Sequence, residues 1–265
     1  MKPLELLPRE PCQTLVGVVF DVDDTLTRDG TIEREAFESL WRLADAGIHR
    51  IAVTGRPLGW AEVMAMHWPI DAAVGENGAG WFWREGANLR EGYFDSENQR
   101  ENHREVFARI VARVGRDLPH VRQPLDQRAR RCDLAFDVAE RDHLSSVDVG
   151  ALVALIESEG ARALVSSVHV HAQMSSCDKA RGAERAARDA LGLHLESTRT
   201  SWIFVGDSGN DAAAFAWFPV SVGVANVVDH LERIELHPVF ITRLDRGRGF
   251  AEVVDHILRA RLTPR

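Results

Sequence analysis

Three groups of polar residues in the sequence directly follow apolar runs. Residues 18–27, VVFDVDDTLT, place three aspartates where a hydrophobic run ends; TGR (54–56) follows IAV and GDSGND (206–211) follows WIFV. In open α/β sheets ligands bind outside the carboxyl ends of the strands, so clusters that are remote in sequence can converge there. Carboxylates held close together repel one another unless a cation neutralises them, and hard oxygen ligands of this kind suit Mg²⁺.

An aspartate in such a cluster can act as a nucleophile toward phosphorus. Asp21 can attack a phosphoryl group to form an aspartyl-phosphate, and Asp23 can protonate the leaving oxygen and later deprotonate water. Thr54 and the amides after it can hold phosphoryl oxygens, and Lys179 offers a second fixed positive charge. Asp24 has no catalytic role in this scheme, so we expect it to point away from the phosphate and to act structurally.

Strand-like and helix-like segments alternate at both ends of the chain. TLVGVVFD (14–21) and SWIFVGD (201–207) have the continuous apolar character of buried strands. Thr31 is a suitable N-cap for a helix that Gly47 would close. The alternation predicts an α/β fold, a doubly wound, parallel, Rossmann-like core of three layers.

The pattern of apolar and polar residues changes over residues 85–175. Helices are expected at about 97–115 and 146–159, and strands in CDLAFDVA and ALVSSVHVHAQ, where apolar and polar residues alternate as in a sheet with one open face. We therefore expect an α+β cap, residues 85–175, inserted into a core made of residues 1–84 and 176–265.

The amino-acid composition indicates which classes of partner and which compartment to expect. The chain has 32 Lys and Arg against 40 Asp and Glu, a net charge of −8, which argues against nucleic acid as the main partner. Three cysteines without a CxxC pair favour a reducing compartment. No apolar run is long enough to span a membrane and no signal-peptide pattern is evident, so a cytoplasmic location is expected. The sequence does not indicate an oligomeric state.

The four motifs resemble those of the haloacid dehalogenase (HAD) superfamily of aspartate-nucleophile phosphatases. DVDDT looks like its first motif, TGR its second, Lys179 its third and GDSGND its fourth, with the cap between the second and third. TGR, ENGA and GDSGND look most like subclass IIB, sugar-phosphate phosphatases with a C2-type cap such as sucrose-phosphate and mannosyl-phosphoglycerate phosphatases. The lysine motif departs from the usual pattern, because DKARG lacks a glycine directly after the lysine.

The resemblance implies that Asp21 is the nucleophile and Asp23 the general acid and base. The Mg²⁺ ligands that it implies are the Asp21 carboxylate, the Asp23 backbone carbonyl, Asp207 and, through water, Asp211. The residues implied to bind the phosphoryl group or support the site are Thr54, Gly55, Arg56, Lys179 and Asn210.

Other polar residues have two readings. Glu76 and Asn77, in the loop that leads to the cap, either touch substrate or do not. His169 and His171 share a face of the last cap strand, which either covers the active site or faces solvent; as a zinc pair they lack a third ligand of matching spacing. The arginines at 128, 130 and 131 either form a solvated patch, which is the preferred interpretation, or meet a substrate anion.

These observations predict a Mg²⁺-dependent phosphomonoesterase for a small phosphorylated metabolite, a sugar phosphate by the resemblance. The alternatives are a phosphomutase or phosphotransferase of the same fold, a phosphate-accepting signalling domain and a catalytically idle binding protein. A signalling domain of that kind lacks the cap and the GDSGND cluster, and an idle binding protein would not need every catalytic position filled.

Overall fold

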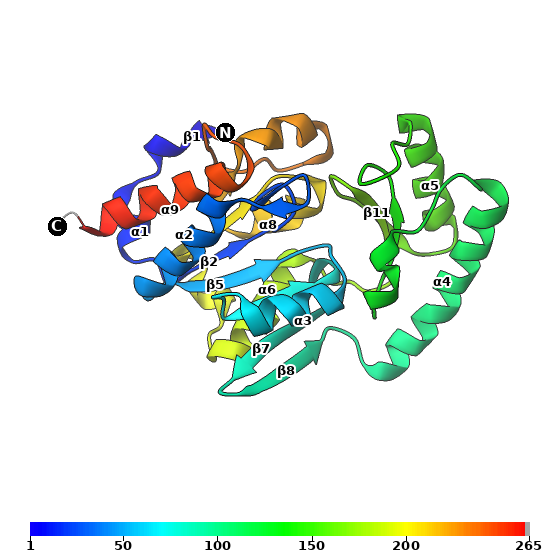
Figure 1. Ribbon diagram of the computed structural model, residues 1–265, viewed down its shortest axis with the longest axis horizontal. Helices are drawn as coiled ribbons and strands as arrows, with labels where there is room; N and C mark the ends of the chain where they lie inside the picture. The colour runs from blue at the N-terminus through cyan, green and yellow to red at the C-terminus, as the bar shows by residue number, and fades with distance from the viewer. Residues whose placement is uncertain (263–265) are drawn as a thin grey trace.

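The computed structural model describes residues 1–262, which form a central sheet with a smaller unit beside it (Figure 1). The central sheet has nine strands, parallel from one edge as far as β6 and antiparallel at β7 and β8. From edge to edge they are β1 (Lys2–Pro3), β14 (Phe240–Ile241), β13 (Val220–Gly223), β12 (Trp202–Gly206), β2 (Gly17–Phe20), β5 (His49–Val53), β6 (Ala72–Gly75), β7 (Gly80–Glu85) and β8 (Asn88–Tyr93).

The three strands that precede the polar clusters are neighbours at the centre of this sheet. Phe20 of β2 is opposite Val205 of β12 on one side and Ala52 of β5 on the other, and all three strands are parallel. Their carboxyl ends therefore meet at one edge, and every residue of β2 and β12 is buried. The expected convergence of the three clusters follows from this order.

Helices cover both faces of the sheet, which confirms the expected doubly wound α/β fold. One face packs on α1 (Arg9–Gln13), α2 (Arg34–Asp45), α3 (Leu58–His67) and α9 (Arg246–Leu262). The other packs on α6 (Lys179–Leu191), α7 (Leu195–Thr198) and α8 (Ala212–Trp217). Short 3₁₀ turns complete the chain: η1 (Leu4–Leu6), η2 (Glu76–Gly78), η3 (Leu125–Ala129), η4 (Arg199–Ser201), η5 (Gly209–Asp211) and η6 (Ala225–Arg233).

The inserted unit is a three-stranded antiparallel sheet backed by two helices. The strand order is β10 (Arg162–Val165), β11 (His169–Gln173), β9 (Leu134–Asp137), and the helices are α4 (Glu97–Asp117) and α5 (Ser146–Ser158). Apolar residues on one face of the sheet, including Val170 and Ala172, pack against the two helices. The polar face, with His169 and His171, is buried toward the core.

Two local expectations need correction. The cap was expected from residue 85, but β8 (Asn88–Tyr93) pairs with β7 in the central sheet, because a turn with Gly86 at φ +62° closes the hairpin. We therefore place the start of the cap after β8. Thr31 is not an N-cap: Thr31–Ile32 forms β4, which pairs with β3 (Thr27–Arg28) across a turn with positive φ at Asp29 and Gly30, and α2 begins at Arg34.

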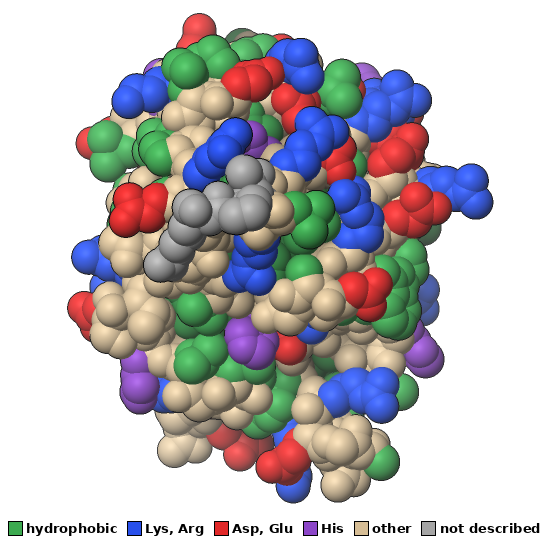
Figure 2. Space-filling model, turned by 90° about the vertical axis from the view of Figure 1, so that its left-hand side faces the viewer, with side chains coloured by type: hydrophobic (Ala, Val, Ile, Leu, Met, Phe, Trp, Pro, Cys, Tyr) green, Lys and Arg blue, Asp and Glu red, His purple; other side chains and the backbone are tan. Residues whose placement is uncertain are grey.

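The left-hand side of the molecule in Figure 1 has Lys and Arg side chains interspersed with Asp and Glu (Figure 2). No large patch of side chains with the same sign of charge is visible in that view. Within residues 1–262, no helix combines the length and apolar character needed to cross a membrane.

Candidate active site

Lys179 joins the first and fourth motifs through two short ion pairs. Its Nζ lies 2.6 Å from Oδ1 of Asp21 and 2.6 Å from Oδ1 of Asp211, and all three side chains are buried. Burial disfavours the ammonium, yet the two carboxylates raise the pKa of Lys179 above its ordinary value. Burial also raises the pKa of Asp21, to about 7, against the opposing effect of Lys179.

Three carboxylates form a group with the dimensions of a metal site. Asp21, Asp207 and Asp211 each offer an oxygen, and these oxygens lie within 4.8 Å of one another. Burial, followed by the charges of Asp21 and Asp211, raises the pKa of Asp207 well above its ordinary value. Three ionised carboxylates beside one ammonium leave two negative charges uncompensated, which a divalent cation would neutralise. This donor set fits Mg²⁺.

Asp211 orients the site rather than presenting a free carboxylate to it. Its Oδ2 accepts hydrogen bonds from the backbone amides of Asp207, at 2.9 Å, and Ser208, at 3.0 Å, while Oδ1 binds Lys179. A Cβ on Gly206 would lie 2.5 Å from this Oδ2, so only glycine allows the close approach. Asp211 thus links the GDSGND turn to Lys179.

The TGR motif lies against Asp23. Arg56 contacts both carboxylate oxygens of Asp23, with Nε at 2.9 and 3.0 Å, and the Thr54 hydroxyl lies 3.3 Å from Oδ2. The backbone N–H of Arg56 donates to Thr54 Oγ1 at 3.0 Å. Nη1 of Arg56 also reaches Glu140 of the cap at 2.7 Å, so one guanidinium bridges the expected acid/base and the cap. Glu140 was not identified from the sequence.

The Asp24 carboxylate pairs with Arg246, whereas those of Asp21 and Asp211 pair with Lys179. Oδ1 of Asp24 accepts from Nε of Arg246 at 2.9 Å, and the Asp24 carbonyl accepts from the side chain of Asn226 at 3.0 Å. Asn226 also donates to Oδ2 of Asp207 at 3.2 Å. Asp24 has φ +54°, a backbone conformation that glycine adopts more readily, so its partners offset local strain.

The cap closes over these residues. A cavity of about 10 Å³, the room that one water needs, lies between core and cap. Its lining comprises Asp21, Asp23, Gly55, Ser166, Ser167, Val168, His169, His171, Ser208 and Asn210. The structure therefore brings the expected catalytic aspartates and both cap histidines to the same space, in a closed form too small for a phosphomonoester.

Glu76 joins the core to the cap and does not line this cavity. Oε1 accepts from the amides of Leu58 and Arg131, both at 2.9 Å, and Oε2 accepts from those of Cys132, at 2.6 Å, and Asp133, at 2.9 Å. Burial and the neighbouring Asp133 raise the pKa of Glu76 to about 7, although the amides favour the charged form. With both oxygens occupied, Glu76 acts as a structural tie, and the suggested substrate contact is not supported.

Asn77 and Asn210 lie together at the edge of the site. Nδ2 of Asn210 donates to Oδ1 of Asn77 at 2.9 Å, while Nδ2 of Asn77 is buried without a partner among the described residues. The same turn fixes Lys179: a Cβ on Gly182 would lie 2.5 Å from the Cα of Gly78, so a glycine one turn into α6 lets this helix approach η2. Gly182 therefore allows the close approach of α6, although the DKARG motif has no glycine directly after Lys179.

Arg130 is not part of a solvated patch. Its guanidinium is fully buried, and Nη1 donates to Oδ1 of Asp133 at 2.8 Å and to the carbonyl of Gly55 at 2.9 Å. Oδ2 of Asp133 lies 3.1 Å from Nδ1 of His171. Because Asp133 follows Arg130 at i+3 but outside any predicted helix, the sequence offered no signal for this buried set.

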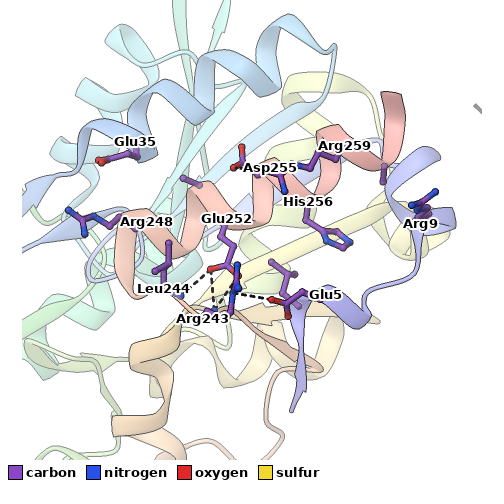
Figure 3. Close-up of a pocket in the computed structure, with 13 residues that line it drawn as sticks. Glu5, Arg9, Glu35, Arg243, Leu244, Arg248, Glu252, Asp255, His256 and Arg259 are labelled. Atoms are coloured by element: carbon purple, nitrogen blue, oxygen red, sulfur yellow. Dashed lines mark hydrogen bonds and ion pairs between the residues drawn. The ribbon is translucent and has the colours of Figure 1, made fainter. Parts of the chain in front are cut away.

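A larger cavity, of about 530 Å³, lies between the N-terminal segment and α9 (Figure 3). It shares no lining residue with the cavity at Asp21. Some of its charged side chains pair with one another; Arg243 lies 3.0 Å from Glu5 and also binds Glu252. The expected catalytic groups are elsewhere, so we assign no chemistry to this cavity.

Residues 18–109 match the family model of the haloacid dehalogenase-like hydrolases. The chain has the fold of that family. A protein from Thermoplasma acidophilum aligns with a TM-score of 0.71 at 21% identity, covering 92% of this chain and 98% of that one. The sucrose-phosphatase of Synechocystis sp., solved with sucrose and phosphate, gives 0.64 at 16% identity over 92% and 98%.

A third solved structure, that of a HAD subclass IIB sugar phosphatase, aligns with a TM-score of 0.54 at 15% identity, covering 91% of this chain and 98% of that one. No curated protein sequence matches the chain. The likeness in fold agrees with the sequence resemblance, and the inserted unit lies in the sequence between TGR and Lys179.

Proposed function

We propose that the protein is a Mg²⁺-dependent phosphomonoesterase that acts through an aspartyl-phosphate on a small phosphorylated metabolite. The observation that carries the proposal is the buried set of Asp21, Lys179, Asp207 and Asp211, with the TGR loop and Asp23 beside it. The likeness to phosphatases of known structure, one a sucrose-phosphatase, supports a sugar phosphate as the substrate.

In the proposed mechanism Asp21 attacks phosphorus in line with the leaving oxygen, and Asp23 protonates that oxygen. Water, deprotonated by Asp23, then hydrolyses the aspartyl-phosphate. Lys179 holds Asp21 in place through its ion pair, and Thr54, whose Oγ1 accepts from the Arg56 amide, would bind the phosphoryl oxygens together with the amide of Gly55.

Mg²⁺ would be held by Asp21, Asp207 and the backbone carbonyl of Asp23, with Asp211 behind them. When bound, it would offset the charge of these carboxylates and of the phosphoryl group.

The cavity of about 10 Å³ at Asp21 admits no phosphomonoester, and a cavity of about 430 Å³ adjoins it at Asp23, Ser167 and Val168, so substrate would enter from that side with a movement of the cap. The Arg56–Glu140 and Arg130–Gly55 contacts hold the two units together. Closure after binding would exclude bulk water during the first transfer.

The test is phosphate release from a panel of phosphorylated metabolites, with Mg²⁺ and with a chelator. We expect Mg²⁺-dependent turnover in the wild type and a loss on the order of a thousandfold in Asp21→Asn. The matched control is Asp117→Asn at the exposed end of α4, which should retain full activity.

Three results would contradict the proposal. Turnover by Asp21→Asn equal to that of the wild type would exclude Asp21 as the nucleophile. Wild-type protein inactive on every ester would point to a binding protein. Turnover in ¹⁸O-labelled water without label in the phosphate or the product would favour a mutase or phosphotransferase.

A further inference from the structure

His171 has one ring nitrogen engaged and the other free, in the cavity that contains the proposed nucleophile. The side chain is fully buried in β11, with Nδ1 at 3.1 Å from Oδ2 of Asp133. Nε2 is buried without a partner among the described residues. It lies 3.1 Å from the position that a Cβ on Gly55 would take, and His171 lines the cavity together with Asp21 and Asp23.

The surroundings of His171 determine which nitrogen carries the proton. Nη1 of Arg130 also lies 3.5 Å from Nδ1, but its two hydrogens already point to Asp133 and to the carbonyl of Gly55, at 2.8 and 2.9 Å. The Asp133 carboxylate can only accept, so Nδ1–H donates to it. In the neutral ring Nε2 then presents a lone pair to the cavity.

A buried acceptor without a partner is unfavourable, and it becomes satisfied when a ligand brings a donor. Burial lowers the pKa of His171 to about 4, in spite of Asp133, so the ring is neutral near pH 7. A neutral acceptor does not attract phosphoryl oxygens, which are themselves acceptors at that pH. The complementary group is therefore a hydroxyl of the leaving group.

We propose that Nε2 of His171 accepts a hydrogen bond from a substrate hydroxyl close to the ester oxygen, which makes His171 a determinant of specificity for hydroxylated leaving groups. Because His171 lines the same cavity as Asp21 and Asp23, we expect this hydroxyl to lie near the ester oxygen, as on the carbon next to the ester carbon. Arg130 and Asp133 act as positioning residues, because they fix the tautomer and the ring. This inference rests on the proposed phosphatase function and names the group that selects its substrate.

Two substitutions of His171 separate the functions of its two nitrogens. In His171→Asn the side-chain amide takes the place of Nδ1–H, so the donor to Asp133 remains and the acceptor in the cavity is lost. In His171→Gln the amide group reaches the place of Nε2 and can restore an acceptor. Circular dichroism and thermal melting establish that both variants are folded.

The experiment compares kcat/KM for 2-hydroxypropyl phosphate and propyl phosphate, which differ in one hydroxyl. We expect the wild type to prefer the hydroxylated ester by about tenfold or more, His171→Asn to have a ratio near one, and His171→Gln to recover part of the preference. An unchanged ratio in His171→Asn overturns the inference. Equal losses on both esters with weaker inhibition by inorganic phosphate also overturn it, because His171 would then meet the phosphoryl group.

Binding to Asp21→Asn, measured by calorimetry in the presence of Mg²⁺, distinguishes this inference from the proposed function. The same ratio in Kd, abolished by adding His171→Asn, supports the role of His171 even where the wild type hydrolyses neither ester, in which case only the phosphatase proposal fails. Hydrolysis without a hydroxyl preference leaves the phosphatase and removes the role of His171. Failure to bind either ester overturns both.

Discussion

The tie made by Glu76 can be tested with one substitution that keeps the size of the side chain. In the wild type, each carboxylate oxygen of Glu76 accepts hydrogen bonds from two backbone amides. Glu76→Gln replaces one of these oxygens by the NH₂ group of an amide. Either orientation of the glutamine amide leaves two buried N–H groups facing another donor. The loss of an acceptor costs about 1–3 kcal/mol for each buried group, so the expected destabilisation is about 2–6 kcal/mol.

The assay is urea unfolding at pH 8, where the Glu76 carboxyl is ionised, since its pKa is about 7. Hydrogen exchange at the amides of Cys132 and Asp133 should also accelerate, because these groups lose their acceptor. The control is Glu62→Gln: Glu62 pairs with Arg131 at 2.5 Å in a half-exposed position, and its loss should cost less than about 1 kcal/mol. The reasoning is refuted if the two variants lose the same free energy of unfolding.

Three further outcomes are expected. Asp24→Gly should lose less than about tenfold in kcat/KM, because glycine suits φ +54° and the side chain binds only Arg246, whereas Asp23→Asn should lose about a hundredfold or more; comparable losses would mean that the cluster is misassigned. Mg²⁺ at a hundred times its Kd should raise the free energy of unfolding by about 2.7 kcal/mol, seen as a higher Tm, and Asp207→Asn should abolish the increment. The pKa of His171 is about 4 in the folded protein and 6.5 in the unfolded chain, so the unfolded chain binds more protons between these values and the free energy of unfolding falls as the pH drops from 6.5 to 4. His171→Asn should reduce this fall by up to about 3 kcal/mol in urea titrations. An identical fall in both proteins would exclude a buried neutral ring.

The core and its polar clusters could be predicted because they depend on local pattern and on one rule of sheet topology. Apolar runs such as GVVF predict buried strands, and parallel strands bring the residues after them to one edge. The contact between Lys179 and Asp21 follows from that edge and from the start of α6. No property of the cap enters this argument.

The contacts between cap and core could not be predicted, because each depends on two surfaces whose relative position no local pattern determines. Arg130 reads as a solvated arginine until Asp133 and the Gly55 carbonyl are placed around it. Glu76 reads as a loop acid until four amides converge on it. Thr31 failed as an N-cap for a local reason, since the turn at Asp29 and Gly30 takes its backbone into a hairpin.

The division between core and cap has a consequence for the proposed enzyme. Asp21, Asp23 and Lys179 belong to the core, and Arg56 holds Asp23 through contacts that opening of the cap would leave intact. In the proposed enzyme the cap would contribute the side chains that meet the leaving group, and its Glu140 shares Arg56 with Asp23.

Substitutions in the core should therefore slow all substrates alike, because they act on the phosphoryl transfer common to every ester. Substitutions on the inner face of the cap should instead change the ratio between substrates, because in the proposed enzyme that face would meet the leaving group. A cap variant that lowered kcat/KM equally for every ester would contradict this division, unless it acted through Glu140 and Arg56. Glu140→Gln would identify that exception, because it removes the negative charge that pairs with Arg56 and leaves His171 and its neighbours Asp133 and Arg130 in place.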